Sequence, residues 1–224
     1  MHEDSDSTLL PLFPLPLVLY PEMNLPLHIF EARYREMIGR CLEERSAFGL
    51  VLSHEGRVFE VGCAARVVDV LRRFPNGEYD ILIRGQRRFR TSRFLEEKEY
   101  LQAEVSFFED EASLDPEADF RAREQLLERI LDSCRPLVPK PESLKEILNF
   151  PKGPSDTPSF SLAQRFRFDL RFQQRILEMT RENDRLQLIS DFLSDLLVQS
   201  EPKPIRDFLF LKGNGRGNGH GKSN

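Results

Sequence analysis

Residues 11–38 read PLFPLPLVLYPEMNLPLHIFEARYREMI, with five prolines within the sixteen positions from Pro11 to Pro26. Proline fixes its own φ, has no N–H to donate and pushes the preceding residue toward an extended conformation. The sequence therefore predicts an extended segment over residues 9–27 at a sheet edge or in a crossover, because it cannot supply a full ladder of hydrogen bonds. Residues 15–19 are expected to pair on one side only.

A helical pattern follows near residues 30–45. Its apolar residues recur at spacings of three and four, and charged residues fill most of the other face. This periodicity predicts a first, amphipathic helix. The apolar positions are Phe30, Tyr34, Met37, Ile38, Cys41 and Leu42.

Residues 48–110 have the composition of consecutive strands. A run rich in β-branched residues precedes Asn76-Gly77 and a second run follows it, which predicts a hairpin. Gly85 in the return strand predicts a bulge or a close approach of two backbones. Residues 101–107 alternate apolar and polar side chains, as a half-buried strand does.

The chain changes character near residue 113, where helical signals begin. Asp115-Pro116-Glu117 predicts a helix start, and an apolar stripe continues from there to Cys134. The proline-rich residues 135–158 leave room for one short helix near residues 142–149.

Two further helices are expected toward the C-terminus. Ser161 and Gln164 have the spacing of a capping box that opens a long helix, whose apolar positions extend to Met179. A last helix is expected near residues 183–198. Strands that come early and helices that come late indicate an α+β fold class.

The composition is that of an ordinary soluble protein with one large or two modest domains. Of the 224 residues 40% are hydrophobic and 31% are charged, and the formal net charge is −5. The N-terminus is acidic and prolines interrupt the only long apolar run, which argues against a secretory signal or a membrane span. Cys41, Cys63 and Cys134 form no C-x-x-C pair and are expected to be small buried hydrophobic residues. These features predict a cytoplasmic protein without a membrane partner.

The opening stretch, LPLFPLPLVLYPEMNLPLHIFEARYREMI, resembles the start of the Lon substrate-binding domain, the non-proteolytic N-terminal region of the Lon protease family. FGLVL, VGCAARVVDVLRRFPNGEYDILIRGQRRFR and YLQAEVSFFED resemble the successive strands of that domain, in the expected order. RFQQRILEMTRENDRLQLISDFLSDLL is similar to the helical bundle that follows them, and the resemblance covers roughly residues 8–199.

The resemblance implies a PUA-like β pseudobarrel followed by a C-terminal α-helical subdomain. We expect a flexible N-terminus over residues 1–8 and a barrel over residues 9–112 that includes the helix near 30–45. A helical bundle is expected over residues 113–199, and a disordered glycine-rich tail over residues 200–224.

The sequence indicates no catalytic residue and no cofactor. Gly221-Lys222-Ser223 ends like a phosphate-binding loop, but Arg216 stands where its first glycine is needed. Ser53-His54-Glu55 are adjacent in sequence and point in alternating directions, so they cannot form a catalytic relay. We expect these three residues to lie in a solvated turn, and we expect neither ATPase nor peptidase activity.

No metal site is expected, because the four histidines are too scattered to form a ligand set. They are His2, His28, His54 and His220. His28 lies between two apolar residues before the first helix, where a hydrogen-bonded structural role is favoured over that of a ligand or base.

Glu31 and Arg33, at the start of the first helix, admit two interpretations. Both could contact a charged peptide from the exposed face of the helix. Alternatively, Glu31 stabilises the first helical turn, where an acid favours the helix dipole, and could pair with Arg87 or Arg88. We favour the structural interpretation for Glu31.

An arginine-rich strand offers an alternative, RNA-binding function. Arginines that alternate with aromatic residues can contact phosphates and bases. The same alternation is typical of a half-buried strand, and Asp69, Glu78 and Asp80 are expected to neutralise it across the sheet. The acidic chain disfavours nucleic acid as a partner. The arginines concerned are Arg84, Arg87, Arg88, Arg90 and Arg93.

The preferred function is that of a non-catalytic module that binds unfolded or partly unfolded polypeptide. An apolar groove beside an unpaired strand edge would suit an extended client segment. A protease or chaperone is the expected second partner, and the sequence carries no signal for an oligomeric state. The candidate peptide-binding residues are Leu19, Tyr20, Met23, Leu25, Phe30, Arg33 and Tyr34. The alternative for the apolar ones is a core position, which we favour for Phe30 and Tyr34.

Overall fold

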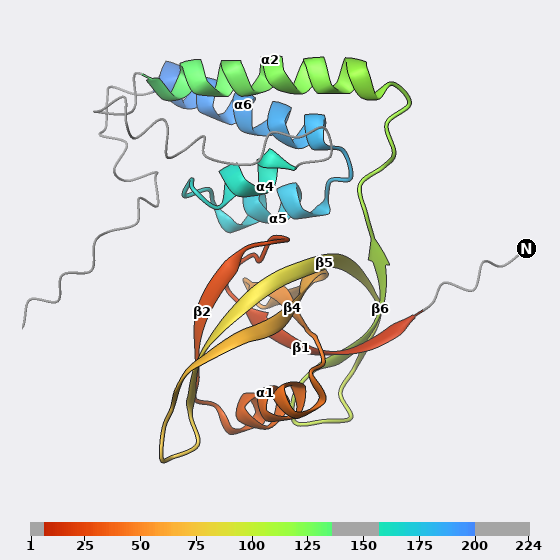
Figure 1. Cartoon of the computed structure of the whole chain (residues 1–224), viewed down its shortest axis with the longest axis vertical. Helices are drawn as coiled ribbons and strands as arrows, with labels where there is room; N and C mark the ends of the chain where they lie inside the picture. The colour runs from red at the N-terminus through yellow and green to blue at the C-terminus, as the bar shows by residue number, and fades with distance from the viewer. Residues whose placement is uncertain (1–6, 136–156, 200–224) are drawn as a thin grey trace, which may run out of the picture.

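The strands form a barrel, and most of the helices form a layer across one of its ends, as the computed structural model shows (Figure 1). The structure describes residues 7–135 and 157–199. The strands in this part are β1 (Thr8–Leu15), β2 (Asn24–Ile29), β3 (Phe48–His54), β4 (Arg57–Arg73), β5 (Tyr79–Leu95) and β6 (Gln102–Phe108). The helices are α1 (Ala32–Glu44), α2 (Pro116–Cys134), α4 (Pro158–Ala163), α5 (Leu170–Glu178) and α6 (Glu182–Gln199). The predicted α+β class, with a barrel first and helices after it, is confirmed.

The long strand β5 closes the barrel. The strand order is β2-β5-β4-β3-β1-β6, and an additional pairing of β5 with β6 joins the two ends. The first part of β5, residues 79–84, pairs with β2, and the later part, residues 88–95, pairs with β6. Strand β2 therefore lies beside the closed ring, and among the described strands it pairs with β5 alone.

The proline-rich strand β1 lies inside the sheet, so its expected position at an edge is wrong. Residues 8–11 of β1 pair with β6, and residues 12–15 pair with β3. Each half thus forms a ladder on one side, which spares the prolines the two-sided ladder they cannot supply. The strand ends at Leu15, and residues 16–23 form the crossover that the prolines predicted.

Helix α1 covers the end of the barrel away from the helical layer (Figure 1). Its apolar stripe buries Tyr34, Met37, Ile38 and Cys41 against the strands. The first predicted helix is therefore confirmed, with one exception in its apolar set: Phe30 precedes the helix and is 59% exposed.

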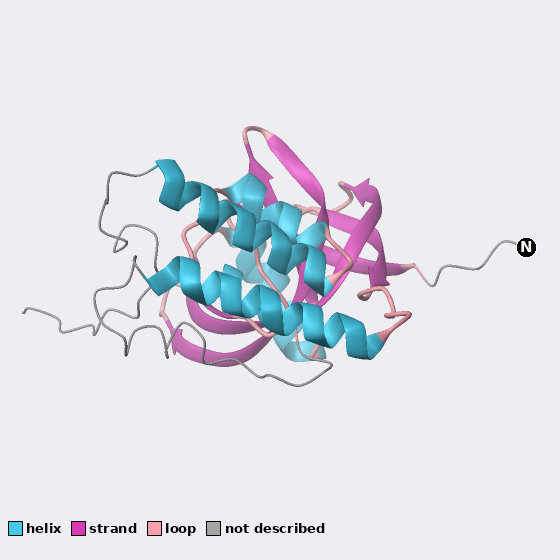
Figure 2. Ribbon diagram, turned by 90° about the horizontal axis from the view of Figure 1, so that it is seen from above, coloured by secondary structure: helices cyan, strands magenta, loops and turns pink. Residues whose placement is uncertain are grey.

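The helical layer holds two long helices over two short ones. Helices α2 and α6 run side by side (Figure 2), and Asn183 near the start of α6 donates to the carbonyl of Asp119 near the start of α2 at 3.0 Å. Helices α4 and α5 lie between this pair and the barrel (Figure 1). None of the described helices is long and apolar enough to cross a membrane.

The expected long helix from Ser161 is wrong, because two helices occupy that stretch. Helix α4 ends at Ala163 and α5 begins at Leu170. The buried rings of Phe166 and Phe168 lie in the break, and Asp169 caps α5 by accepting the N–H of Phe172 at 2.9 Å. The short helix expected near 142–149 and the tail over 200–224 lie outside the described residues.

Two glycines occupy the special positions that the sequence predicted. Gly77 has φ +85° in the turn between β4 and β5, which confirms the hairpin. A Cβ on Gly85 would lie 2.1 Å from the carbonyl oxygen of Tyr20, so the crossover passes directly over this residue of β5. The predicted close approach is confirmed, and it fixes the start of β2 against β5.

Candidate functional site

The crossover residue Tyr20 joins the barrel to the helical layer. Its ring stacks on Phe160 of α4 with 5.5 Å between ring centroids, and its hydroxyl donates to the carbonyl of Gln173 in α5 at 3.0 Å. Burial raises the pKa of the Tyr20 hydroxyl, so this group is a neutral donor. Tyr20 therefore has a structural role at the junction.

A buried ion network forms the polar part of the same junction. Arg185 of α6 is fully buried and contacts both carboxylate oxygens of Asp110, the Glu182 carboxylate at 2.7 Å and the Ser159 hydroxyl at 2.8 Å. Glu182 in turn accepts the Ser159 N–H at 2.8 Å and its hydroxyl at 2.6 Å. These bonds tie α4, α6 and the segment after β6 together.

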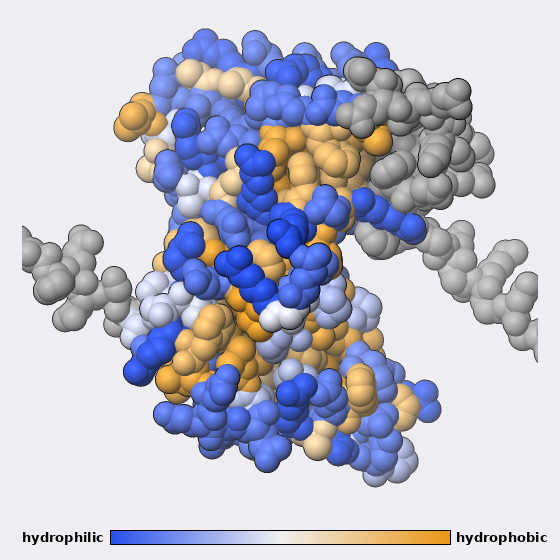
Figure 3. All heavy atoms as spheres, turned by 180° about the vertical axis from the view of Figure 1, so that it is seen from behind, coloured by the Kyte–Doolittle hydropathy of each residue, from blue (hydrophilic) through white to orange (hydrophobic). Residues whose placement is uncertain are grey.

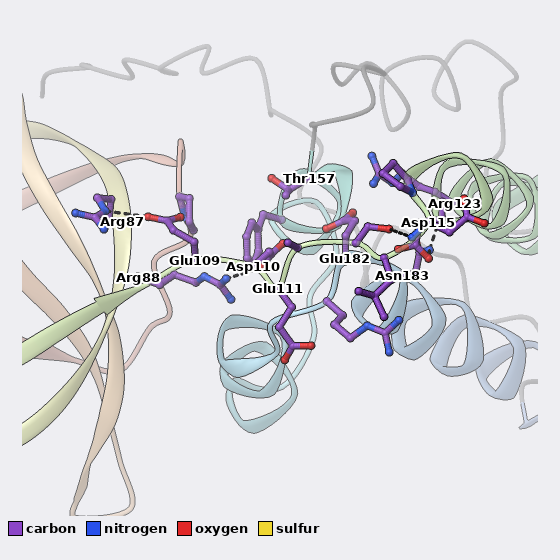
Figure 4. Close-up of a pocket in the computed structure, with 18 of the residues that line it drawn as sticks. Arg87, Arg88, Glu109, Asp110, Glu111, Asp115, Arg123, Thr157, Glu182 and Asn183 are labelled. Carbon is purple, nitrogen blue, oxygen red and sulfur yellow. Dashed lines mark hydrogen bonds and ion pairs between the residues drawn. The ribbon is translucent and has the colours of Figure 1, made fainter. Parts of the chain in front are cut away.

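Arg88 connects β5 to this network and is only 3% exposed. Its guanidinium pairs with Asp110 (Figure 4). It also donates to the carbonyls of Leu177 at 3.0 Å and Met179 at 2.6 Å. Burial lowers the pKa of Arg88, and the nearby Asp110 carboxylate opposes that shift. One carboxylate therefore serves two buried arginines, one from the barrel and one from the helical layer.

A cavity of about 770 Å³ lies beside the network (Figure 4). Its walls come from β5, the segment after β6 and the starts of α2 and α6. Several of its carboxylates already have partners, since Glu109 pairs with Arg87 at 2.9 Å and Glu111 accepts the Thr180 hydroxyl at 2.6 Å. The described lining contains no histidine, cysteine or lysine, so it holds none of the usual nucleophile–base pairs.

Three exposed apolar residues lie at β2 and β4, the two strands that flank the first part of β5, and we call them the β2 patch. Phe30 follows β2, and Val68 and Leu71 lie on β4. Phe30 is 59% exposed, Val68 51% and Leu71 53%. Val68 and Leu71 sit where the register between β4 and β5 shifts, so each bulge turns an apolar side chain outward. His28 lies beside this patch, with its ring 6.0 Å from the ring of Phe30.

The other side of the molecule has a different apolar surface. Seen from behind, apolar side chains gather around the waist between the barrel and the helical layer, and hydrophilic ones dominate the top and the base (Figure 3). The stacked rings of Tyr20 and Phe160 show that the interior of this waist serves to dock the two parts.

The structure divides the predicted peptide-binding residues between core and surface. Leu19 and Tyr20 are each 1% exposed and Tyr34 is buried, so these three occupy core positions. Met23 and Leu25 are partly buried against the same core. Phe30 is well exposed, so the expectation that it packs in the core is wrong.

Arg33 and Glu31 bind each other on the surface. Arg33 donates to the Glu31 carboxylate from Nε at 2.9 Å and from Nη2 at 2.7 Å. Glu31 precedes α1 as its N-cap residue, and its side chain makes no capping bond. The expected pairing of Glu31 with Arg87 or Arg88 is wrong, because those arginines reach Glu109 and Asp110 instead.

The arginine-rich strand is paired with acids, although not with the predicted ones. Arg84 pairs with Glu22, Arg87 with Glu109 and Arg93 with Glu104. The predicted partners Glu78 and Asp80 contact His28 instead. Phe89 is fully buried, so it offers no face on which a base could stack. Phe94 of the same strand is 38% exposed. Among the described contacts, Arg90 alone of the five arginines has only a ring contact, with Phe108. The RNA-binding alternative stays a prediction.

The remaining candidates have structural positions. The Nδ1 atom of His28 lies at hydrogen-bond distance, 2.7 Å, from Oδ1 of Asp80, as expected of a structural histidine. Glu55 and Gly56 have positive φ in the turn after β3, so the expected turn is confirmed for Glu55. It is wrong for Ser53 and His54, which are the last residues of β3 and pair with Val58 and Arg57 of β4. The cysteines are free and buried as predicted. Within residues 7–135 and 157–199, no group of three or more His, Cys, Asp or Glu is arranged to hold a metal ion.

Sequence reasoning missed Val68, Leu71 and the buried network. The pairs Val67-Val68 and Val70-Leu71 break the alternation of a half-buried strand, and this break was an available signal for two bulges. The network has no such signal, because Arg88, Asp110 and Arg185 lie far apart in sequence.

The class of structure is a closed barrel with a helical layer at one end. A family model described as the ATP-dependent protease La (LON) substrate-binding domain matches residues 9–195. The chain belongs to this family.

Relatives and solved structures agree with this assignment. The Lon protease of Brevibacillus choshinensis is 22% identical over 206 residues, and that of Escherichia coli K12 is 24% identical over 222 residues. These alignments cover 87% and 92% of this chain but only 26% and 27% of the two relatives, so the chain spans about a quarter of their length.

Two solved structures are similar to most of the chain. The crystal structure of a Lon N-terminal domain protein from Xanthomonas campestris is 26% identical, with a TM-score of 0.57, and the match covers 86% of this chain and 98% of that one. The N-terminal domain of Lon protease from the Mycobacterium avium complex is 21% identical, with a TM-score of 0.60, and the match covers 84% and 99%. The second likeness concerns the fold alone.

Proposed function

We propose that this chain is a non-catalytic module that recognises exposed apolar segments of client proteins through the β2 patch. The observation that carries this proposal is the exposure of Phe30, Val68 and Leu71, each more than half exposed, at the two strands that flank the first part of β5. Apolar side chains gathered on a surface often mark a protein interaction site. The family's description as a substrate-binding domain also supports the binding of client proteins.

The module acts as an adaptor in this proposal. It holds a partly unfolded client in the cytoplasm and delivers it to a protease or chaperone, and its own residues carry out no chemistry. The cavity at the junction supports a non-catalytic role, since its described lining lacks the usual nucleophile–base pairs. The barrel supplies the client surface, and the helical layer is the remaining surface for a second partner.

The proposal is tested by titrating the protein against a fluorescently labelled, permanently unfolded model protein and following the anisotropy. We expect a dissociation constant on the order of micromolar, since a small surface with few anchors binds weakly. Phe30→Asp is expected to weaken binding about tenfold, because a central aromatic anchor carries much of the binding energy. The variant should keep its melting temperature, since Phe30 is largely exposed.

Leu9→Asp is the matched control. Leu9 is 53% exposed, which is close to the exposure of Phe30, but it lies on β1 away from β2. Binding by this variant should equal that of the wild type. No anisotropy change at high protein concentration, or equal losses in the two variants, would count against the proposed function.

A further inference from the structure

The free side of β2 presents a defined set of backbone groups. Before β2 starts, Glu22 donates its N–H to the carbonyl of Gly85 at 2.9 Å, and Gly85 donates to the carbonyl of Met23 at 2.9 Å. Two residues thus oppose one, and Glu22 has φ 64°, which is the arrangement of a G1 bulge. This bulge sets the phase of the antiparallel ladder that follows.

In an antiparallel pair, successive residues alternately face the partner strand and face away from it. The backbone of Met23 faces β5. Asn24, Pro26 and His28 follow it at odd spacings, so their backbone groups point away from β5. Pro26 agrees with this phase, since it has no N–H to give to β5. Within residues 7–135 and 157–199, the side of β2 away from β5 therefore offers three carbonyls and the N–H groups of Asn24 and His28.

Partly exposed apolar side chains accompany this edge. Leu25 and Leu27 point to the barrel interior, but both are only partly buried and pack on its core. A strand added beside β2 (Figure 1) would place every second side chain next to them. Such a strand therefore needs apolar residues at alternate positions.

The end of β2 is acidic. The imidazole of His28 contacts Asp80 at 2.7 Å through Nδ1 and Glu78 at 3.4 Å through Nε2. Two carboxylates thus share one imidazole, and both are partly exposed. The nearby cations include Arg72, which lies opposite Asp80 in the register of β4 and β5, with its guanidinium 4.4 Å from the centroid of the Phe74 ring. The others have contacts elsewhere: Arg33 with Glu31, Arg84 with Glu22, Arg35 with the carbonyl of Asn76 and Arg73 with the ring of Tyr79.

We propose that β2 captures its client as an added strand, and that the preferred client segment alternates apolar residues and carries a lysine or arginine that meets Glu78 and Asp80. This inference rests on the proposed function and names the client chemistry and the mode of capture. Backbone hydrogen bonds give sequence-independent affinity, and the acidic end selects among apolar segments. The net charge of −5 also favours client segments that are basic.

Backbone capture is tested with a labelled peptide of about ten residues that alternates valine and threonine around one lysine. A strand presents alternate N–H groups to opposite sides. N-methylation of one alternate set of amides should weaken binding at least about tenfold, whereas methylation of the other set should change it less than about twofold. Equal effects of the two sets would overturn the strand-addition mode.

Charge selection is tested with the same peptide carrying glutamine in place of lysine. The wild-type protein should bind the lysine peptide about three- to fivefold more tightly, as expected of partly exposed ion pairs. Glu78→Gln combined with Asp80→Asn should abolish that difference, and Glu96→Gln with Glu97→Gln, in the exposed loop after β5, should preserve it. An unchanged preference in the first variant would overturn the assignment of Glu78 and Asp80.

These outcomes separate the inference from the proposed function. Binding of the unfolded model protein that depends on Phe30, without any effect of peptide charge or methylation phase, leaves the function intact and overturns the inference. Failure of the peptide to bind while the unfolded protein binds has the same meaning. Failure of both ligands to bind removes the proposed function and the inference together.

Discussion

At the scale of single residues, Gly85 shows how one position sets a whole surface. The crossover carbonyl of Tyr20 lies where any other residue would carry its Cβ, and the backbone of Gly85 bonds both Glu22 and Met23. The phase of β2, and hence the groups at its free side, follows from these contacts. A residue without a side chain is therefore required to expose that edge correctly.

Gly85→Ala is expected to lower the free energy of unfolding by about 2–3 kcal/mol, because the clash is with backbone, which cannot rotate away. Urea denaturation measures the change. Gly39→Ala in α1 is the control, since no atom lies within 4 Å of its added Cβ. The control should be neutral or stabilise by about 0.5–1 kcal/mol, because alanine is the better helix former. An equal loss in both variants would contradict the close approach.

The cysteines give a pH-dependent prediction. Burial raises the pKa of Cys63 and of Cys134 to about 12, and it also raises the pKa of Cys41. A raised pKa favours the protonated thiol, which is not a nucleophile. A disulfide reagent at about pH 8 should therefore react slowly with the native protein and with all three thiols after unfolding. Prompt reaction of a full equivalent with native protein would contradict the burial.

At the scale of elements, the sequence predicts well wherever local patterning decides the outcome. The first helix, the hairpin at Asn76-Gly77 and the last helix follow from periodicity and turn chemistry, and the structure contains all three. The position of β1 inside the sheet could not be predicted, because splitting one strand between two partners depends on the closure of the barrel. Phe30 of the candidate site was found, whereas Val68 and Leu71 were missed since both depend on bulges.

The break between α4 and α5 illustrates tertiary packing that overrides a local signal. Ser161 and Gln164 have capping spacing, yet Asp169 is the residue that caps a helix. Asp169→Ala should lower the free energy of unfolding by about 1 kcal/mol, since one orphan N–H of α5 loses its acceptor. Ser161→Ala should change it by less than about 0.5 kcal/mol. Thermal unfolding of both variants measures the difference. A larger loss of stability for Ser161→Ala than for Asp169→Ala would support the capping box instead.

At the scale of the whole molecule, a buried ion network holds the barrel and the helical layer in one arrangement. Arg88 comes from β5, Arg185 from α6, and Asp110 from the segment between the two parts. No spacing in the sequence predicts this meeting, because it exists only after both parts have folded and docked. The removal of one partner leaves a charge buried without compensation.

Arg185→Met is therefore expected to lower the free energy of unfolding by about 3–5 kcal/mol, because the buried Glu182 loses its cation and Asp110 keeps only one of its two arginines. Arg129→Met is the control, since its contact with Asp191 at 3.8 Å is exposed, and it should change stability by less than about 0.5 kcal/mol. Chemical denaturation followed by circular dichroism compares them. A small effect of Arg185→Met would show that the network contributes little.

The crossover belongs to both halves of the molecule. The Tyr20 hydroxyl forms a hydrogen bond with α5, and strand β2 begins only a few residues after Tyr20. In the proposed function, a client bound to β2 would therefore also exert force on the helical layer, because a short stretch of chain connects β2 to Tyr20. A protease or chaperone bound to those helices would then sense, through this force, whether a client is bound to β2.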